Sequence, residues 1–272
     1  PGSGLNGRIS KEDVKNYVKS SMSLPSDQGV IGDKPEFEEF DFSKFGSVNE
    51  QSLTRIQKQV AKNMARNWRA IPHVTQHDDI DVTDLETFRK EMESTLGKLS
   101  AVAFIVKAVT IALKDFPQLN ASLKNDGETL VLKEYIHVGL AVNVKDGLLV
   151  PVIKNADQKG LRELSYEISR LADGARDGAL SFQDFSGSSF TVSSLGKLGG
   201  TGFSPIISHP EVAILGVGRS SDRLMMSEGG VSNRKILPLS LSYDHRVING
   251  VYGGEFMARI SDVLTDVRKL SI

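Results

Sequence analysis

Residues 101–114, AVAFIVKAVTIALK, constrain the fold more than any other segment, because they predict a helix that is apolar on nearly every side. A helix without a polar face must lie in the interior, with other elements packed around it. The chain has 272 residues, which is enough for one large domain with a small appendage. We therefore expect this helix to be central and buried.

Helical and strand patterns alternate irregularly around this segment. Apolar spacing predicts further helices over residues 52–69, 83–96, 161–175 and 250–268. Thr83 and Glu86 have the spacing of a capping box at the start of the second of these helices. Strands are predicted over residues 72–82, 129–133, 136–144, 148–154, 189–194, 212–218 and 235–243. The irregular connections favour an α/β or α+β class built around a mixed sheet.

Charge and composition exclude several classes of function. Lys plus Arg number 33 and Asp plus Glu number 34, so the net charge is −1 and nucleic acid is not an expected partner. No apolar run reaches the roughly 18 residues of a membrane span. The lack of Cys excludes disulfides and thiolate metal sites, and it fits a reducing compartment. The chain opens at Pro1 without a signal peptide, so we expect a fragment whose targeting segments are missing.

His245 is the histidine whose surroundings best suit catalysis. It ends an apolar strand in LSLSYDHRVING, and Asn249 follows four residues later, where a turn into the last helix is expected. The pattern predicts a base held rigidly at a strand end, and a ring satisfied by the backbone is the equally weighted alternative. His73 and His77 share one face of a predicted strand, but no further ligand of clear spacing lies nearby. We expect solvated or interface histidines there, and no metal site.

A hydroxyl-rich segment, FTVSSLG, lies upstream of this histidine and offers Ser193 or Ser194 to stabilise a charged intermediate. Alternation along a strand allows only one of the two side chains to face a site. Neither has the flanking glycines of a nucleophile elbow. Asp244 precedes His245 directly, so its side chain is expected to point to the opposite face and to be a poor partner for the imidazole.

Five blocks of sequence follow one another in a recognisable order. They are LTRIQKQVAKNM, IPHVTQHDDIDVTDLETFRK, HVGLAVNVKDGLLVPVIKNAD, FTVSSLGKLGGTGFSPIISHPEVAILGVG and ILPLSLSYDHRVING. Together they resemble the dihydrolipoyl acyltransferases, the core components of 2-oxo acid dehydrogenase complexes, and especially the bacterial pyruvate-complex acetyltransferases. DHRVING is similar to the HxxxDG signature that this family shares with chloramphenicol acetyltransferases. The resemblance implies a chloramphenicol acetyltransferase-like two-layer sandwich, with a mixed sheet flanked by helices.

The resemblance also implies a reaction and the residues that perform it. An acyl group would pass from the thiol of a dihydrolipoyl group, carried on a lipoyl domain, to the thiol of coenzyme A, without a metal. His245 matches the family's general base, and Ser193 matches the residue whose hydroxyl hydrogen-bonds the oxyanion. Asn249 stands where Asp is common, so we expect a structural role there, with Arg55 as its partner. Arg89 matches a position that binds coenzyme A phosphate; a solvated helix arginine is the alternative.

Residues 1–20 resemble the C-terminal half of a peripheral subunit-binding domain, residues 21–35 are expected to be a flexible linker, and residues 36–272 correspond to the acyltransferase core. The family implies homotrimers that assemble into a 24-mer, with a 60-mer as the alternative. Decarboxylase and dihydrolipoyl dehydrogenase components would dock on the subunit-binding domain. The expected location is the cytoplasm of a bacterium, or the mitochondrial matrix of a eukaryote.

Other functions stay open at this point. A non-catalytic core or tethering protein of the same fold is disfavoured by the presence of His245 and Ser193. A free acetyltransferase that acts on a small hydroxyl substrate is disfavoured by the docking remnant in residues 7–20. Within the family, acetyl is preferred to succinyl or branched-chain groups because SLSYDHRVING is most similar to pyruvate-complex members.

Overall fold

The computed structural model describes residues 40–271, apart from Lys98 and residues 228–229. The chain divides into two units, Pro1–Ser52 and Leu53–Ile272. The expected subunit-binding segment and linker, residues 1–20 and 21–35, lie outside the described residues. The described part of the first unit holds one short 3-10 turn, Phe42–Lys44, whose start is capped by the Asp41 carboxylate. The second unit carries the fold.

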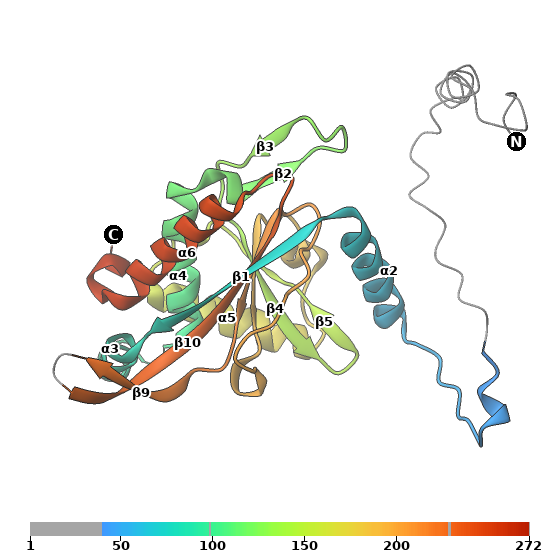
Figure 1. Cartoon of the computed structure of the whole chain (residues 1–272), viewed down its shortest axis with the longest axis horizontal. Coiled ribbons are helices and arrows are strands. Elements are labelled where there is room, and N and C mark those ends of the chain that lie inside the picture. The colour runs from blue at the N-terminus through green and yellow to red at the C-terminus, as the bar shows by residue number, and fades with distance from the viewer. Residues whose placement is uncertain (1–39, 98, 228–229, 272) are drawn as a thin grey trace, which may run out of the picture. The chain divides into compact units, whose positions relative to one another are not determined.

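An eight-stranded sheet forms the centre of the second unit (Figure 1). Its main path runs in the order β1-β10-β8-β7-β4-β5, while β6 pairs with β4 and β9 pairs with β10. Strand β7 is parallel to β4 and β8, and the other pairings are antiparallel. The strands are β1 His73–Asp81, β4 Val138–Val144, β5 Gly147–Leu149, β6 Val152–Ile153, β7 Phe190–Ser194, β8 Ala213–Val217, β9 Ser221–Ser227 and β10 Gly230–Asp244. The predicted mixed sheet is confirmed.

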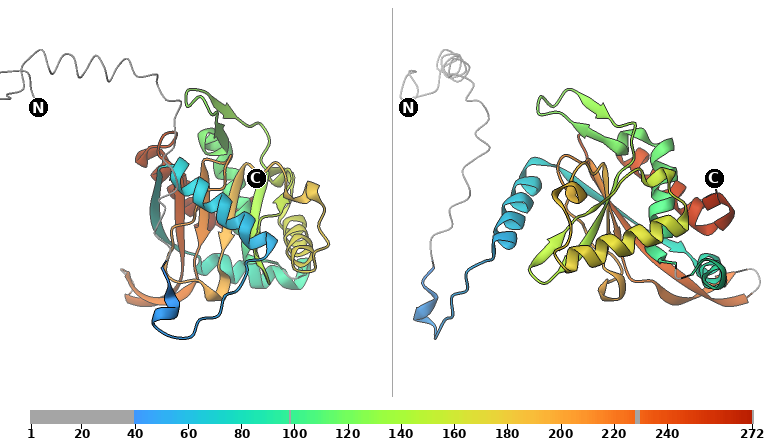
Figure 2. Two further views of the ribbon diagram at one scale, coloured as in Figure 1. Left: turned by 90° about the vertical axis from the view of Figure 1, so that its right-hand side faces the viewer. Right: turned by 180° about the vertical axis from the view of Figure 1, so that it is seen from behind.

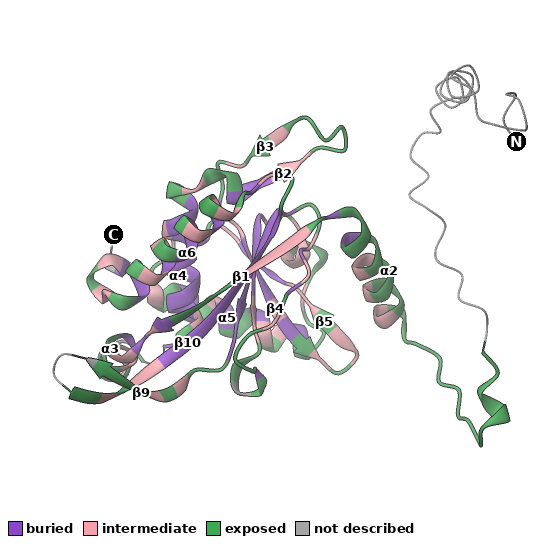
Figure 3. Cartoon of the chain, in the orientation of Figure 1, coloured by how far each residue is buried: buried purple, intermediate pink, exposed green. Residues whose placement is uncertain are grey.

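Four helices pack against one face of this sheet and enclose the main core. They are α3 Thr83–Leu96, α4 Ala101–Asp115, α5 Leu161–Arg176 and α6 Gly250–Thr265. The rear view in Figure 2 brings α5, in yellow, in front of the strands. Helix α4 is buried on most of its sides, as its all-round apolar sequence predicts, and burial concentrates there and in the central strands (Figure 3). The two-layer arrangement is therefore confirmed.

The opposite face of the sheet is rich in hydroxyl groups. Strand alternation places Thr191 there, because its neighbours Phe190 and Val192 belong to the helix-side core. The Thr75 and Ser242 hydroxyls lie 2.8 Å apart across the β1–β10 pair. The loop before β8 covers part of this face, where Ile71, Ile207 and Ile214 form a small buried apolar cluster. This face, with its polar lining, is the one available for a site.

Helix α2, Arg55–Ala70, precedes β1 and begins with a capping box formed by Thr54 and Gln57. The capping box expected at Thr83 and Glu86 is wrong. The Thr83 hydroxyl donates to the Asp81 carboxylate and accepts from the Lys235 backbone N–H, so it links β1 to β10. Helix α3 starts at Thr83 without a side-chain cap.

Other predicted boundaries differ for identifiable reasons. The strand expected over residues 148–154 is interrupted at Pro151, which has no N–H to give to a ladder. The last helix ends at Thr265 and is followed by a 3-10 turn, Val267–Ser271. A small hairpin of β2, Ala121–Leu123, and β3, Leu130–Leu132, was expected only in its second strand. None of the described helices is both long enough and apolar enough to cross a membrane.

Candidate active site

His245 follows the last residue of β10, and its backbone is fixed on both sides. Its N–H donates to the Pro72 carbonyl at 3.0 Å. The buried Asp244 carboxylate accepts from the backbone N–H and the guanidinium of Arg246, with the closest contact at 2.6 Å. Asp244 therefore points toward Arg246 and does not orient the imidazole, as strand alternation predicts. This ion pair also raises the pKa of the Arg246 guanidinium.

The His245 side chain itself is exposed, and within the described residues its ring nitrogens make no hydrogen bond. Its ring centroid lies 5.9 Å from that of Tyr243. A ring satisfied by the backbone is thus wrong. What the strand end presents is a free imidazole on a rigid main chain, which suits a general base.

Asn249 has the structural role that the sequence predicts. It is the N-cap of α6, and its side-chain oxygen accepts from the Tyr252 backbone N–H at 2.9 Å. This contact satisfies one of the donors that every helix start leaves unpaired. Asn249 therefore fixes the turn between the His245 strand and the last helix.

Replacement of Asn249 by Asp should leave both folding and acyl transfer close to those of the parent, since Asp is an equally good cap and its charge favours a helix N-terminus. Asn249→Ala removes the cap and should lower the free energy of unfolding by about 1 kcal/mol. Chemical denaturation and a turnover assay check both results. A collapse of turnover in Asn249→Asp with unchanged stability would show that the chemistry needs the amide NH₂ group.

Ser193 lies on β7 and is half-buried, on the same hydroxyl-rich face as Thr191. Its hydroxyl has no hydrogen-bond partner within the described part of the chain. The hydroxyl of the neighbouring Ser194 accepts from the Gly196 backbone N–H at 3.4 Å. Of the two serines offered by the sequence, Ser193 is the one left free to bind another group.

A single chain does not bring Ser193 and His245 together. Strand register places Ser193 opposite Gly216 on β8, and Gly216 opposite Ser240 on β10. His245 comes five residues after Ser240, which is about 16 Å along an extended strand, and two strand spacings add about 10 Å sideways. The base and the hydroxyl thus stand toward opposite ends of the sheet, so both act on one substrate only if they come from different copies of the chain.

The two arginines expected at the site are placed elsewhere. The Arg89 guanidinium is paired within the chain, with Glu86 at 2.9 Å and Glu93 at 2.5 Å, and it also donates to the Leu99 carbonyl. Its side chain is 18% exposed. Its role as a phosphate ligand is therefore not supported, because most of its N–H donors already serve these neighbours. The solvated alternative is also wrong, since the side chain is mostly buried.

Arg55 is the first residue of α2, whereas the other end of that helix leads to Pro72 beside His245. At 1.5 Å per residue, about 22 Å of helix separates Arg55 from Ala70. Within one chain no contact joins Arg55 to Asn249, whose side chain is occupied by the α6 cap. The expected pairing is not found in the chain.

His73 and His77 are structural. The His73 ring donates from Nδ1 to the Ile71 carbonyl at 2.8 Å and accepts at Nε2 from the Ile207 N–H at 2.9 Å, which fixes its tautomer. His77 Nδ1 lies 2.9 Å from the Ser240 hydroxyl. Across residues 40–271, with the gaps given above, no group of three or more His, Asp or Glu side chains is arranged to hold a metal ion.

Glu211 was not predicted from the sequence, although its carboxyl group is buried at the same end of the sheet as His245. Its Oε1 accepts from the Thr191 hydroxyl at 2.8 Å. The available signal was its position, since an ionisable residue directly precedes the apolar run VAILGV that becomes a fully buried strand.

The architecture is that of chloramphenicol acetyltransferase, a solved structure of which aligns with a TM-score of 0.50 and 16% identity over 75% of this chain and 94% of that chain. This likeness concerns the fold alone. The family model described as 2-oxoacid dehydrogenases acyltransferase (catalytic domain) matches residues 45–272, and the chain belongs to this family. The resemblance inferred from the five sequence blocks is confirmed.

Relatives within the family are closely similar. The chain is 46% identical over 285 residues to the dihydrolipoyllysine-residue acetyltransferase component of the pyruvate dehydrogenase complex of Cupriavidus necator, with 99% of this chain and 51% of that protein covered. The corresponding Haemophilus influenzae protein is 44% identical, with 99% and 51% covered. The chain thus spans about half the length of these curated relatives.

Two solved structures match with a TM-score of 0.85 and 43% identity, over 88% of this chain and 100% of each of theirs. One is the dihydrolipoamide acetyltransferase of Azotobacter vinelandii, studied for the roles of a serine, a histidine and an asparagine in its catalytic mechanism. The other is the cubic core of the pyruvate dehydrogenase multienzyme complex.

Proposed function

We propose that the protein transfers an acetyl group from a dihydrolipoyl thioester to coenzyme A, as the acyltransferase core of a pyruvate dehydrogenase complex. The observation that carries this proposal is the free imidazole of His245 on a fixed strand end. The serine, histidine and asparagine studied in the Azotobacter vinelandii enzyme are separated by 52 and 4 residues, and so are Ser193, His245 and Asn249. The names of the curated relatives support acetyl as the group transferred.

In this proposal the imidazole of His245 takes the proton from the coenzyme A thiol. The resulting sulfur attacks the thioester carbonyl, and a tetrahedral intermediate forms with a negative charge on its oxygen. The Ser193 hydroxyl of a neighbouring copy donates a hydrogen bond to that oxygen. When the intermediate collapses, the bond to the dihydrolipoyl sulfur breaks, and this sulfur receives the proton from the imidazolium. A new thioester and a free dihydrolipoyl thiol are the products, and no net proton is consumed.

The separation of Ser193 from His245 supports a site between copies, and we propose the homotrimer that the family resemblance implies as the smallest active unit. The similarity to a cubic core supports assembly of such trimers into a 24-mer. Coenzyme A and a lipoyl group on a separate lipoyl domain would be the substrates. We further propose docking of the decarboxylase and dihydrolipoyl dehydrogenase components through residues 1–20, and a location in the bacterial cytoplasm.

Mixing two inactive chains tests this proposal directly. Chains with His245→Ala and chains with Ser193→Ala should each lose activity, yet equal amounts unfolded and reassembled together should recover about a quarter of the parent turnover. The reason is that about three-quarters of randomly formed trimers are mixed, and in each of these about one site in three pairs an intact histidine with an intact serine. Separately assembled chains, mixed afterwards, are the control.

Recovery no greater than in that control would contradict a shared site. Absence of acyl transfer by the assembled parent protein, with acetyl-dihydrolipoamide and coenzyme A supplied, would overturn the function itself.

A further inference from the structure

A buried cluster of polar side chains joins the start of β8 to β7 and to the segment after β3, and the reaction described above does not use it. At its centre is Glu211, which is only 4% exposed. Its carboxyl group accepts hydrogen bonds from the Thr191 hydroxyl, at 2.8 Å, and from the Ser188 hydroxyl. The ammonium group of Lys133 interacts with its charge and also donates to the Ala121 carbonyl at 3.1 Å. Three separate segments of the chain therefore meet at one carboxyl group.

Gly139 of β4 leaves the space that this cluster needs. A Cβ atom at this position would lie 2.7 Å from the Thr191 hydroxyl oxygen and 2.8 Å from that of Ser188, which is closer than Cβ atoms approach other atoms. Any larger residue would therefore displace the two hydroxyls from the positions in which they reach the carboxyl group. The neighbouring strand is thus fitted to the polar cluster, which indicates a specific arrangement.

The carboxyl group lowers the stability of the fold at neutral and higher pH. Burial raises the pKa of Glu211 to about 7, although both hydroxyls and Lys133 act in the opposite direction. Keeping the group ionised therefore costs folding free energy, because these partners compensate only part of the lost hydration. Local features that cost stability are concentrated at functional sites. The connection of this residue to His245 indicates which function is served.

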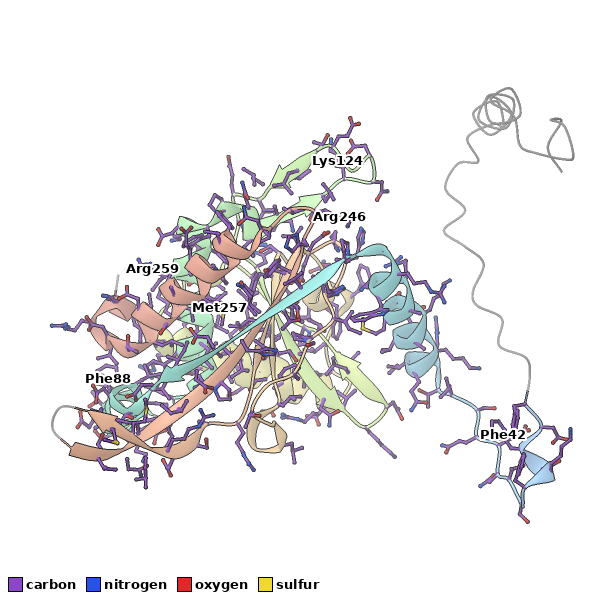
Figure 4. All side chains as sticks on the ribbon, in the orientation of Figure 1. Phe42, Phe88, Lys124, Arg246, Met257 and Arg259 are labelled. Atoms are coloured by element: carbon purple, nitrogen blue, oxygen red, sulfur yellow. The ribbon has the colours of Figure 1, made fainter. Side chains whose placement is uncertain are left out.

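Glu211 is joined to the His245 strand end through the backbone of its neighbour. The carbonyl of the next residue, Val212, accepts a hydrogen bond from the Asp244 N–H at 2.8 Å. On its other side, the strand end is held by the connection between α2 and β1, which accepts from the His245 N–H. Figure 4 labels Arg246, the residue that follows His245, at this strand end. The histidine backbone is thus held between two chain segments, and the buried carboxyl group belongs to one of them.

We propose that Glu211 is a positioning residue, whose carboxylate fixes the start of β8 and thereby holds the imidazole of His245 in place for proton transfer. The inference rests on the proposed function, in which His245 is the base. A carboxylate has two acceptor oxygens and a charge, so it holds both hydroxyls and Lys133 at once. Glutamine has one acceptor oxygen and no charge, so it fixes the same backbone less firmly. A displacement of about 1 Å can cost about 10²-fold in rate, so we expect the effect in the chemical step.

The experiment places Glu211→Gln in one or the other of two complementing chains, Ser193→Ala and His245→Ala, which are reassembled together. In the first mixture the substitution lies in the Ser193→Ala chain, which supplies the histidine of every complete site. In the second mixture it lies in the His245→Ala chain, which supplies the serine. At about pH 8.5, where the carboxyl group is ionised, kcat of the first mixture should be at least about 10-fold lower, with KM unchanged within about 2-fold. A general loss of structure would lower kcat of both mixtures equally.

Thr191→Val, in the chain that supplies the histidine, removes one donor to the carboxyl group and should also lower kcat. Thr110→Val is its matched control, because both threonines are 1% exposed and the Thr110 hydroxyl donates to the Lys107 carbonyl within helix α4. The control should leave kcat unchanged. Equal kcat of the two Glu211→Gln mixtures would overturn the proposal. If chains with Glu211→Gln do not assemble, Thr191→Val decides, and a kcat equal to that of its control overturns the proposal.

Failure of the proposed function gives a different result. If the assembled parent protein transfers no acetyl group, hydrogen exchange still tests whether the carboxylate holds the strand end. The Asp244 amide, which donates to Val212, should exchange at least about 10-fold faster in Glu211→Gln than in the parent, and Thr110→Val should not change it. Equal protection of this amide in Glu211→Gln and the parent would overturn the positioning role, whether or not the protein is an acyltransferase.

Discussion

Replacing His245 with alanine should lower acetyl transfer at least about 10²-fold while the assembly stays intact. Removal of the thiol proton by a positioned base contributes roughly 10²–10⁴ to a rate. The fold should survive because the His245 side chain is exposed and its structural contact uses the backbone N–H, which alanine retains. The measurement is thioester formation on coenzyme A, with light scattering to verify particle mass.

His245→Gln is the matched variant, because glutamine keeps hydrogen-bonding capacity without a basic nitrogen. It should be as inactive as His245→Ala if proton removal is the lost step. Near-parent turnover in either variant, with an intact particle, would refute the assignment of His245 as the base. A large loss in alanine but not in glutamine would indicate a binding role.

The second large effect concerns stability and pH at Glu211. Its pKa in the folded chain, about 7, is above its ordinary value of 4.5, because burial disfavours the charged form. The folded state therefore binds more protons than the unfolded state in this interval, and stability falls as the pH rises through it. The full contribution is present below about pH 4.5 and is lost above about pH 7, and it amounts to about 3 kcal/mol.

Glu211→Gln should remove this dependence because glutamine is neutral throughout. The variant and the parent should unfold at similar urea concentrations at about pH 4, below the ordinary pKa of 4.5, and the variant should become more stable, by up to about 3 kcal/mol, at about pH 8.5. Urea denaturation at one protein concentration checks this, with Glu134→Gln as the exposed control that should show no such trend. A variant less stable than the parent at pH 8.5 would show that the pairing of the carboxylate with Lys133 outweighs the cost of burial.

Sequence reasoning succeeds where one local pattern decides the outcome. The all-round apolar segment becomes the central helix α4, and the capping residue Asn249 marks the start of α6. Alternation, which acts between neighbouring residues, predicts that Asp244 points away from the His245 side and that only one of Ser193 and Ser194 faces a site. The choice of Ser193 over Ser194 comes from the family resemblance, and the structure shows that the Ser194 hydroxyl accepts from the Gly196 N–H.

It fails where distant parts of the chain meet. Strand β9, SDRLMMS, pairs with β10 but is largely exposed and shows no alternation of buried and exposed residues. Its sequence alone therefore does not predict this pairing. The carboxylates that hold Arg89 are ordinary helix neighbours, and nothing in the sequence shows whether the arginine pairs with them or stays free to bind a phosphate. The distance between Ser193 and His245 depends on strand order, which no single block contains.

The position of the base and the hydroxyl at opposite ends of one sheet has a consequence for when the protein becomes active. In the proposed reaction, a single chain carries both the base and the hydroxyl, but they are too far apart to act on the same substrate. A lone chain therefore has no complete active site. Turnover would therefore begin only when subunits join, and it would fade on dilution in step with dissociation. Under the proposed reaction, assembly would switch the activity on, and unassembled chains would leave thioesters intact.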